Sequence, residues 1–109
     1  MPQFHWVILT RAVDGRIKEF EEWYDERHLA DVTAIPRVAS AVRYKVLRND
    51  AVGSDPPSWD SVAIYDFEGD DPNAVIEDIM KVSHTPAMPV SEALAPIVVQ
   101  LLVTSVAKR

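Results

Sequence analysis

The chain has 109 residues, 48% of them hydrophobic, and its 17 acidic against 11 basic residues give a net charge of −6. This length and composition indicate a single folded domain over residues 1–109 and argue against disorder. Nucleic acid and anionic membranes are poor partners for such a chain, because both bind clustered Lys and Arg. The absence of cysteine excludes disulfides and thiolate ligands and fits a reducing compartment, so we expect a cytoplasmic protein.

The first half of the chain predicts a strand, a helix and a second strand. Residues 4–11 are rich in β-branched and aromatic side chains, which favours a strand. After the turn signal Asp14-Gly15, a helical pattern begins near residue 16, with its inner face at positions 17, 20, 24 and 28. Residues 29–35 extend it until Pro36, because the residue before a proline avoids the helical conformation. Residues 38–48 predict the second strand.

The second half predicts a strand, a helix and a last strand. A polar, proline-containing loop at 49–58 precedes a strand at 59–67. Residues 73–82 predict a helix, with Pro72 suited to its first position. An irregular, proline-rich segment at 83–96 leads to a fourth strand at 97–106. The order β-α-β-β-α-β indicates an α+β protein of ferredoxin-like fold, with an antiparallel four-stranded sheet and two helices on one face.

The first and last predicted strands are apolar at both alternating positions, as in Phe4-His5-Trp6-Val7-Ile8-Leu9. A sheet face that meets water should alternate with polar residues. The second face therefore needs a cover, and the simplest cover is the same face of another copy of the chain. We expect a homodimer in which two sheets close into an α+β barrel.

Candidate site residues concentrate on the first predicted helix. Phe20, Tyr24 and His28 are spaced i, i+4, i+8 and form one stripe, with Trp23 beside it. Imidazole titrates near neutral pH, so His28 is the leading general acid or base, and Tyr24 is a hydrogen-bond donor to a substrate oxygen. The alternatives are a hydrogen-bonded histidine at a helix end, a core tyrosine and a packing tryptophan.

Two neighbouring residues of the second strand, Arg43 and Tyr44, must point to opposite sheet faces. An arginine inside a barrel would need a carboxylate or a substrate anion as its partner, whereas an edge-strand arginine would lie along the sheet. His5 on the first strand is a candidate for the same cavity or a satisfied interior histidine. His84 follows the second helix, where a surface loop position is the default. These histidines lack close metal-ligand spacing, so we expect no metal.

The pattern Phe-x-x-Trp-Tyr-x-x-x-His-Leu, followed by Ile-Pro and a strand with Arg-Tyr, resembles the EthD-like branch of the dimeric α+β barrel superfamily. The matching residues are Phe20, Trp23, Tyr24, His28, Leu29, Ile35, Pro36, Arg43 and Tyr44. The pattern usually has proline after His-Leu and glycine after Ile-Pro, where this chain has Ala30 and Arg37. Losing that glycine would alter the turn into the second strand, and Arg37 would bring a positive charge near the cleft mouth.

The resemblance implies a small cofactor-independent enzyme of the isomerase, cyclase or lyase type. It would transfer a proton next to a carbonyl of a hydrophobic, aromatic-derived or lactone-like metabolite, with His28 as base or acid and Tyr24 on the carbonyl oxygen. Arg43 would hold a carboxylate. The remaining candidates for substrate contact are Trp23, His5 and Tyr44. The alternatives are a cofactor-free or haem-dependent monooxygenase, and a non-enzymatic module that binds hydrophobic ligands or self-associates.

Overall fold

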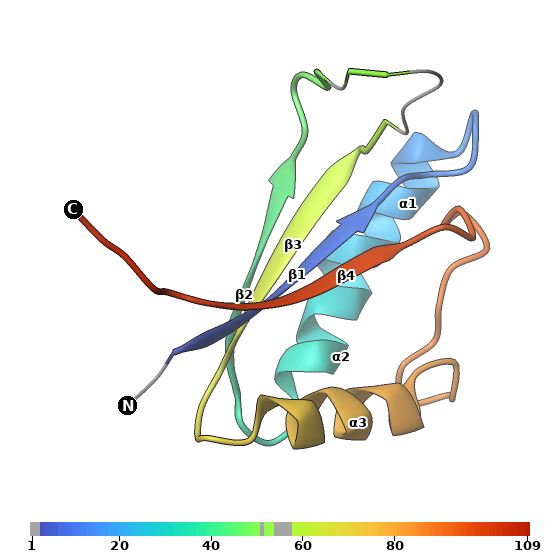
Figure 1. Cartoon of the computed structure of the whole chain (residues 1–109). Coiled ribbons are helices and arrows are strands. Elements are labelled where there is room, and N and C mark those ends of the chain that lie inside the picture. The colour runs from blue at the N-terminus through green and yellow to red at the C-terminus, as the bar shows by residue number, and fades with distance from the viewer. Residues whose placement is uncertain (1–2, 51, 54–57) are drawn as a thin grey trace.

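The computed structural model describes residues 3–50, 52–53 and 58–109. Part of the loop predicted over 49–58 lies outside the described residues. The elements, in chain order, are β1 (Phe4–Thr10), α1 (Ile17–Trp23), η1 (Tyr24–His28), α2 (Leu29–Thr33), β2 (Val38–Lys45), β3 (Ser61–Phe67), α3 (Pro72–Val82) and β4 (Val99–Thr104) (Figure 1). No helix in this part of the chain is long and apolar enough to cross a membrane.

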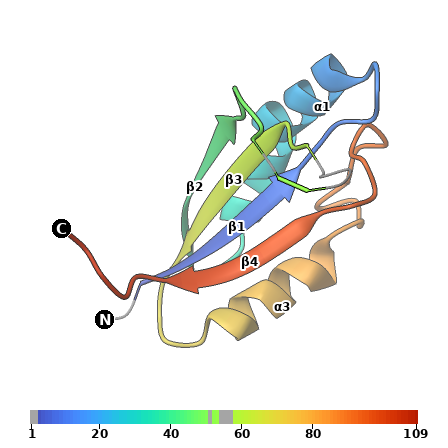
Figure 2. The same ribbon diagram turned by 45° about the horizontal axis from the view of Figure 1, so that its top comes forward.

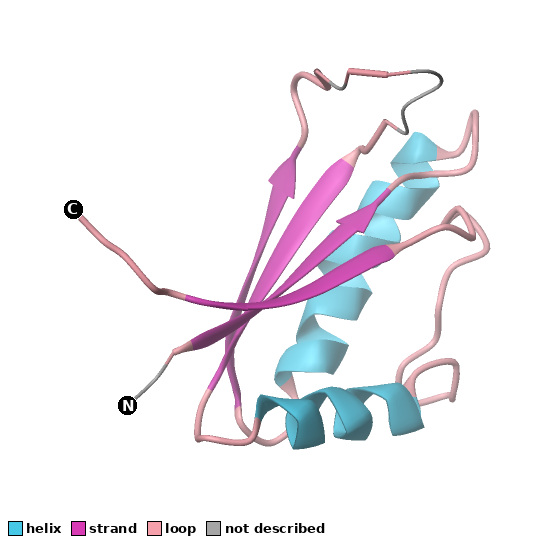
Figure 3. Ribbon diagram, viewed as in Figure 1, coloured by secondary structure: helices cyan, strands magenta, loops and turns pink. Residues whose placement is uncertain are grey.

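The four strands form one antiparallel sheet in the order β2-β3-β1-β4. All helices lie on the same side of this sheet, as the colouring by secondary structure makes plain (Figure 3). Figure 2 shows the strands as one twisted layer with α1 and α3 on that side. This arrangement confirms the predicted α+β, ferredoxin-like fold.

The outer strands are shorter than the sequence predicts, because their lengths are set by the strands they pair with. Pairing of β2 with β3 ends at Lys45 opposite Ser61. Pairing of β4 with β1 begins at Val99 opposite Leu9 and ends at Thr104. Beyond these limits the strand pairing ends, although the N–H of Val46 still donates to the carbonyl of Asp60 at 3.0 Å. Strand propensity alone therefore does not extend the sheet.

Alternation along the central strands separates the two faces of the sheet. On β1, Trp6, Ile8 and Thr10 are buried on the helix side, whereas the residues between them are partly exposed. On β3, Tyr65 is buried on the helix side, and Ile64 beside it faces the other side. We call this second side, which no described element covers, the open face.

The first helix contains a π-helical turn, which differs from the continuous α-helix expected from the spacing of its aromatic residues. The five residues of η1 lie between α1 and α2 without a break, and the backbone N–H of Leu29 donates to the carbonyl of Tyr24, five residues earlier. Tyr24 and His28 still share the face that points to the sheet. Ile17, placed on that face by the sequence pattern, is instead 42% exposed. Single π turns inside α-helices occur frequently at functional sites.

Candidate functional site

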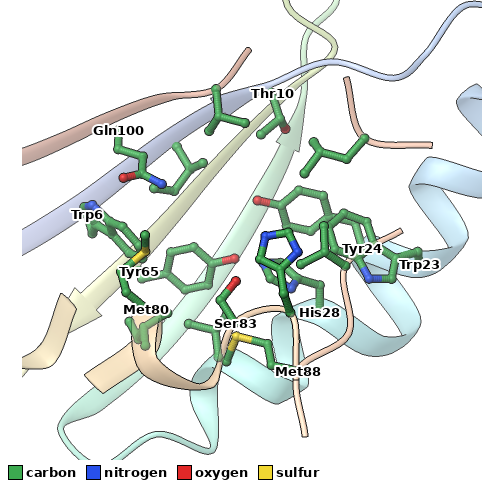
Figure 4. A pocket seen from close by; sticks show the side chains of 17 residues that line it. Trp6, Thr10, Trp23, Tyr24, His28, Tyr65, Met80, Ser83, Met88 and Gln100 are labelled. Carbon is green, nitrogen blue, oxygen red and sulfur yellow. The ribbon is translucent and has the colours of Figure 1, made fainter. Parts of the chain in front are cut away.

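A pocket with a cavity of about 200 Å³ lies between the helix side of the sheet and the helices (Figure 4). Its walls come from β1, β3, β4, α1, η1, α2, α3 and the segment that follows α3. Most of the 17 lining side chains are apolar, and none of those in the described part of the chain is a Lys, Arg, Asp or Glu. The pocket is therefore an apolar, uncharged space of the kind that encloses small hydrophobic molecules.

His28 reaches this pocket from the π turn and is held by two aromatic side chains. Its ring stacks on Trp23 at 4.6 Å between centroids and meets Tyr24 edge-on at 5.1 Å. Its Nδ1 atom is buried and has no hydrogen-bond partner among the described residues. Burial lowers the pKa of His28 to about 4, although the nearby Asp31 carboxylate acts in the opposite direction. The imidazole is consequently neutral at pH 7 and able to accept a proton.

Trp23 and Arg27 attach the segment after α3 to the first helix. The indole N–H of Trp23 donates to the carbonyl of Pro89 at 3.0 Å. The guanidinium of Arg27 donates to the carbonyl of Pro86 at 3.2 Å and also pairs with Asp31 at 2.9 Å. These bonds fix the wall of the pocket opposite the sheet, and they give Trp23 a defined place against the imidazole.

Tyr24 and Tyr65 enter the pocket from opposite walls, one from the helix and one from the sheet, with Thr10 near them (Figure 4). All three residues are at most 2% exposed. The Tyr24 hydroxyl is near enough to Tyr65 and Thr10 for both to affect its pKa. Among the described residues, however, neither Tyr65 OH nor Thr10 Oγ1 has a partner with hydrogen-bond geometry. Burial raises the pKa of both tyrosines, so their hydroxyls stay protonated at neutral pH.

Three buried polar atoms without a partner in the described part of the chain therefore line one pocket: Thr10 Oγ1, His28 Nδ1 and Tyr65 OH. We call these the polar cluster. An unsatisfied buried donor or acceptor costs about 1–3 kcal/mol, and native proteins contain few of them. Their gathering around one cavity indicates that a ligand or water completes their hydrogen bonds when the pocket is filled.

Arg43 lies on the helix side of the sheet but outside the pocket lining. Its guanidinium binds both carboxylate oxygens of Asp25 and also contacts Glu21 at 3.4 Å. The guanidinium carbon is 5.7 Å from the centre of the Tyr24 ring, which gives a cation–π contact. Arg43 thus pairs with protein carboxylates and contacts the ring of Tyr24, and its side chain does not line the cavity.

The structure does not bring His5 and Tyr44 together with His28, because both lie on the open face. His5 forms an ion pair with Asp66, whose other oxygen accepts from the hydroxyl of Ser40 at 3.1 Å. Tyr44 is 52% exposed. Of the six side chains proposed from the sequence, the pocket therefore contains His28, Tyr24 and Trp23.

His84, which the sequence placed on a surface loop, is exposed but also lines the pocket. Its backbone has φ = 67°, a left-handed conformation that is uncommon for residues other than glycine. Its N–H donates to the carbonyl of Met88 at 3.0 Å, which closes a tight turn at this wall. No group of three or more potential metal ligands lies close together in the described part of the chain.

Arg37 occupies the position where the EthD-like pattern has glycine, and its φ of 73° is the conformation that glycine favours. Its carbonyl accepts from the N–H of Glu68 at 2.8 Å, which joins this turn to the end of β3. The turn is therefore kept despite the substitution. Arg37 does not line the pocket, so the structure does not place its charge at the mouth.

Sequence reasoning missed Thr10 and Tyr65, which supply two of the three atoms of the polar cluster. The available signal was their position on strands: Thr10 follows Trp6 and Ile8 at alternate positions, and Tyr65 lies opposite Trp6 in the β1–β3 register. Because both faces of these strands are apolar, the sequence does not show which alternate set faces the helices.

Comparison with known proteins gives a likeness in structure. No protein-family model matches the sequence, and no curated protein matches it significantly. Among solved structures, an EthD family protein from Bacillus halodurans C-125 superposes with a TM-score of 0.51 at 14% sequence identity, covering 97% of this chain and 100% of the other. At this identity the likeness shows the fold, and it confirms the EthD-like fold expected from the residues of the first helix.

Proposed function

We propose that the protein is a small cofactor-independent enzyme of the isomerase, cyclase or lyase type. It would transfer a proton next to a carbonyl group of a hydrophobic, aromatic-derived or lactone-like metabolite. The observation that carries this proposal is the polar cluster, which puts His28 and two hydroxyls around one largely apolar cavity. A positioned base beside hydrogen-bond donors is the minimum that such a reaction requires.

His28 is the proposed base. With a pKa near 4, the free imidazole is neutral but only weakly basic. When a proton leaves the carbon next to a bound carbonyl, negative charge develops on the carbonyl oxygen. An opposite charge at close range favours the imidazolium, so the basicity of His28 rises as the reaction proceeds. Tyr24, which stays protonated, is the proposed donor to that oxygen. Arg43 is already paired with Asp25 and Glu21, so we do not assign it a substrate carboxylate.

The second candidate is a module that binds a hydrophobic ligand without changing it, because the same apolar cavity would serve both roles. The enzyme is favoured because Nδ1 of His28 has no hydrogen-bond partner within the described residues, whereas a histidine that caps a helix end would bond to the backbone. A haem-dependent monooxygenase fits the pocket poorly. The cavity of about 200 Å³ is smaller than the ~300–1,000 Å³ typical of pockets for drug-sized ligands, and haem is a wide macrocycle.

Proton transfer can be tested before the substrate is known, by measuring exchange of the protons next to a carbonyl for deuterium in D₂O. A panel of aryl ketones and lactones is followed by NMR with catalytic amounts of protein. We expect exchange with at least one compound, and its loss in His28→Asn. His5→Asn makes the same chemical change on the open face and should retain exchange. Equal exchange in wild type and His28→Asn would exclude His28 as the base.

We also propose that the protein forms a homodimer through the open face of the sheet. The apolar residues exposed there include Val42, Tyr44, Leu101 and Val103, each 40–52% exposed, and they come from both edge strands. A contiguous apolar surface of this kind usually binds a partner. A second copy would present the same surface about a two-fold axis, which gives a closed assembly.

A further inference from the structure

The most deeply buried polar side chains that line the cavity are those of three hydroxyl residues, Thr10, Tyr24 and Tyr65. Thr10 comes from the end of β1, Tyr24 from the π turn and Tyr65 from β3, so three separate elements place them there. Each of the three residues is at least 98% buried, and Figure 4 shows the two tyrosines pointing toward each other across the space. Such convergence marks a fixed position for one polar atom of a ligand.

These hydroxyls are suited to an oxygen that accepts hydrogen bonds. Both tyrosines stay protonated because burial raises their pKa values, so each keeps an O–H to donate. The threonine hydroxyl rotates to donate or accept. An oxygen with two lone pairs, such as that of a ketone, lactone or phenol, would complete the missing bonds of Tyr65 and Thr10 at once.

The charges around the site disfavour an anion in this position. Arg43, the cation that touches the Tyr24 ring, is surrounded by the carboxylates of Asp25 and Glu21, so that the group as a whole is negative. No described residue lining the pocket is a Lys or Arg. A carboxylate would lose its hydration and gain no cationic partner, which is strongly unfavourable.

The size of the cavity limits the rest of the ligand. An apolar cavity of about 150 Å³ in another protein accepts benzene, so a cavity of about 200 Å³ accepts a single ring with a short substituent. Aromatic walls from Trp6 and Trp23 suit a flat ring.

We infer that the cavity selects an uncharged, single-ring-sized apolar molecule whose one oxygen is held by the hydroxyls of Thr10, Tyr24 and Tyr65, and that it excludes carboxylates. This inference rests on the proposed function in taking the cavity as the ligand site, but it concerns selection of the ligand and not catalysis.

The test uses three probes of nearly equal shape: acetophenone with a carbonyl oxygen, isopropylbenzene with no oxygen, and benzoate with a carboxylate. Binding to the full chain at pH 7.5 is followed by protein NMR chemical shifts. We expect acetophenone to bind at least about 10-fold more tightly than isopropylbenzene, as two or more hydrogen bonds would provide, and benzoate to bind least. Benzoate binding as tightly as acetophenone, equal binding of acetophenone and isopropylbenzene, or no binding of any probe at millimolar concentration would each overturn the inference.

Two conservative variants locate the oxygen. Tyr65→Phe and Thr10→Val should each weaken acetophenone binding about 2- to 10-fold, the value of one neutral hydrogen bond, and leave isopropylbenzene binding unchanged. Tyr44→Phe makes the same change as Tyr65→Phe on the open face and should alter neither affinity. Unchanged acetophenone binding in both Tyr65→Phe and Thr10→Val would contradict the assigned oxygen position; thermal melts confirm that each variant is folded.

Failure of this inference and failure of the proposed function give different results. If acetophenone is selected as expected but no compound exchanges protons, the ligand class stands and the enzymatic proposal fails. If exchange occurs and depends on His28 while benzoate binds best, the enzymatic proposal stands and the ligand class is wrong.

Discussion

The two faces of the sheet are similarly apolar, but they differ in whether their polar side chains have hydrogen-bond partners. On the helix side, the polar atoms of Thr10 and Tyr65 are buried without partners among the described residues, and they surround a cavity. On the open face, His5 and Asp66 pair with each other, with Ser40 beside them, while apolar side chains such as Val42 remain exposed. The unfilled hydrogen-bonding capacity supports the proposed small-molecule site on the helix side, and the exposed apolar area supports the proposed dimer contact on the open face.

The strongest test of this contrast is a pair of measurements on His28→Asn. We expect turnover to fall about 10²- to 10⁴-fold, the usual contribution of a general acid–base group. The melting temperature should change little, because His28 Nδ1 has no hydrogen bond to lose among the described residues. Thermal melts and turnover on one preparation separate the two effects. A variant that melts much lower yet turns over normally would show that His28 is structural.

The open face is tested by placing a charge in it. Wild-type protein should sediment as a dimer at micromolar concentration, and Ile64→Lys should sediment as a monomer or unfold at lower temperature, because a lysine would be buried in the interface without a partner. Ile17→Lys makes the same change on α1, at a residue that is 42% exposed, and should remain dimeric. Wild-type protein that is a stable monomer would disprove the proposed assembly.

The burial of His28 on the helix side also predicts how the stability of the protein depends on pH. Burial lowers the pKa of His28 from 6.5 to about 4, so the unfolded chain binds a proton more readily than the folded one between these values. The contribution of His28 to the free energy of unfolding is therefore fully present above pH 6.5. It is lost as the pH falls toward 4, which lowers the free energy of unfolding by on the order of 3 kcal/mol. Chemical denaturation across this range measures it.

The contribution of His28 to this pH dependence is isolated with two variants. His28→Asn should flatten the decline in stability between pH 6.5 and 4. His84→Asn changes an exposed histidine, in a backbone conformation that asparagine tolerates, and should keep the decline. The same slope in wild type and His28→Asn would mean that the imidazole is not buried in its neutral form.

The smallest effect is expected at the turn that joins the helical layer to β2. Arg37→Gly should stabilise the protein by about 1 kcal/mol or less, since glycine adopts φ = 73° without the steric cost of a side chain but loses more entropy on folding. Arg37→Ala removes the charge and keeps the strained Cβ, so it should give no gain. A larger gain from alanine than from glycine would assign the effect to the arginine side chain instead.

The sequence predicted the fold well because its strongest signals are local. Short runs rich in β-branched and aromatic residues, the Asp14-Gly15 turn and the prolines at 36 and 72 define the order of elements. The aromatic stripe also predicted that Tyr24 and His28 would share an inward face, and both line the pocket. These features depend on residues a few positions apart, where backbone preference dominates.

The parts that could not be predicted depend on pairing between distant segments. From the sequence alone, Arg43 could be a substrate ligand, because only the structure shows that Asp25 and Glu21 are its partners. Thr10 and Tyr65 became site residues only when strand register and facing were known. The π turn at η1 has no simple sequence signature, because its residues suit an ordinary α-helix equally well.

That π turn makes the location of His28 depend on the number of residues before it as well as on their identity. Each residue of an α-helix turns it by about 100°. Deleting a single residue within Tyr24–His28 would restore regular α-helical hydrogen bonds and would rotate the side chains that follow the deletion relative to those that precede it. A relative that keeps the two aromatic residues and the histidine but lacks one residue between Tyr24 and His28 would therefore be expected to present the histidine in a different direction. We therefore expect the pocket to be more sensitive to the length of the first helix than the four-stranded sheet is.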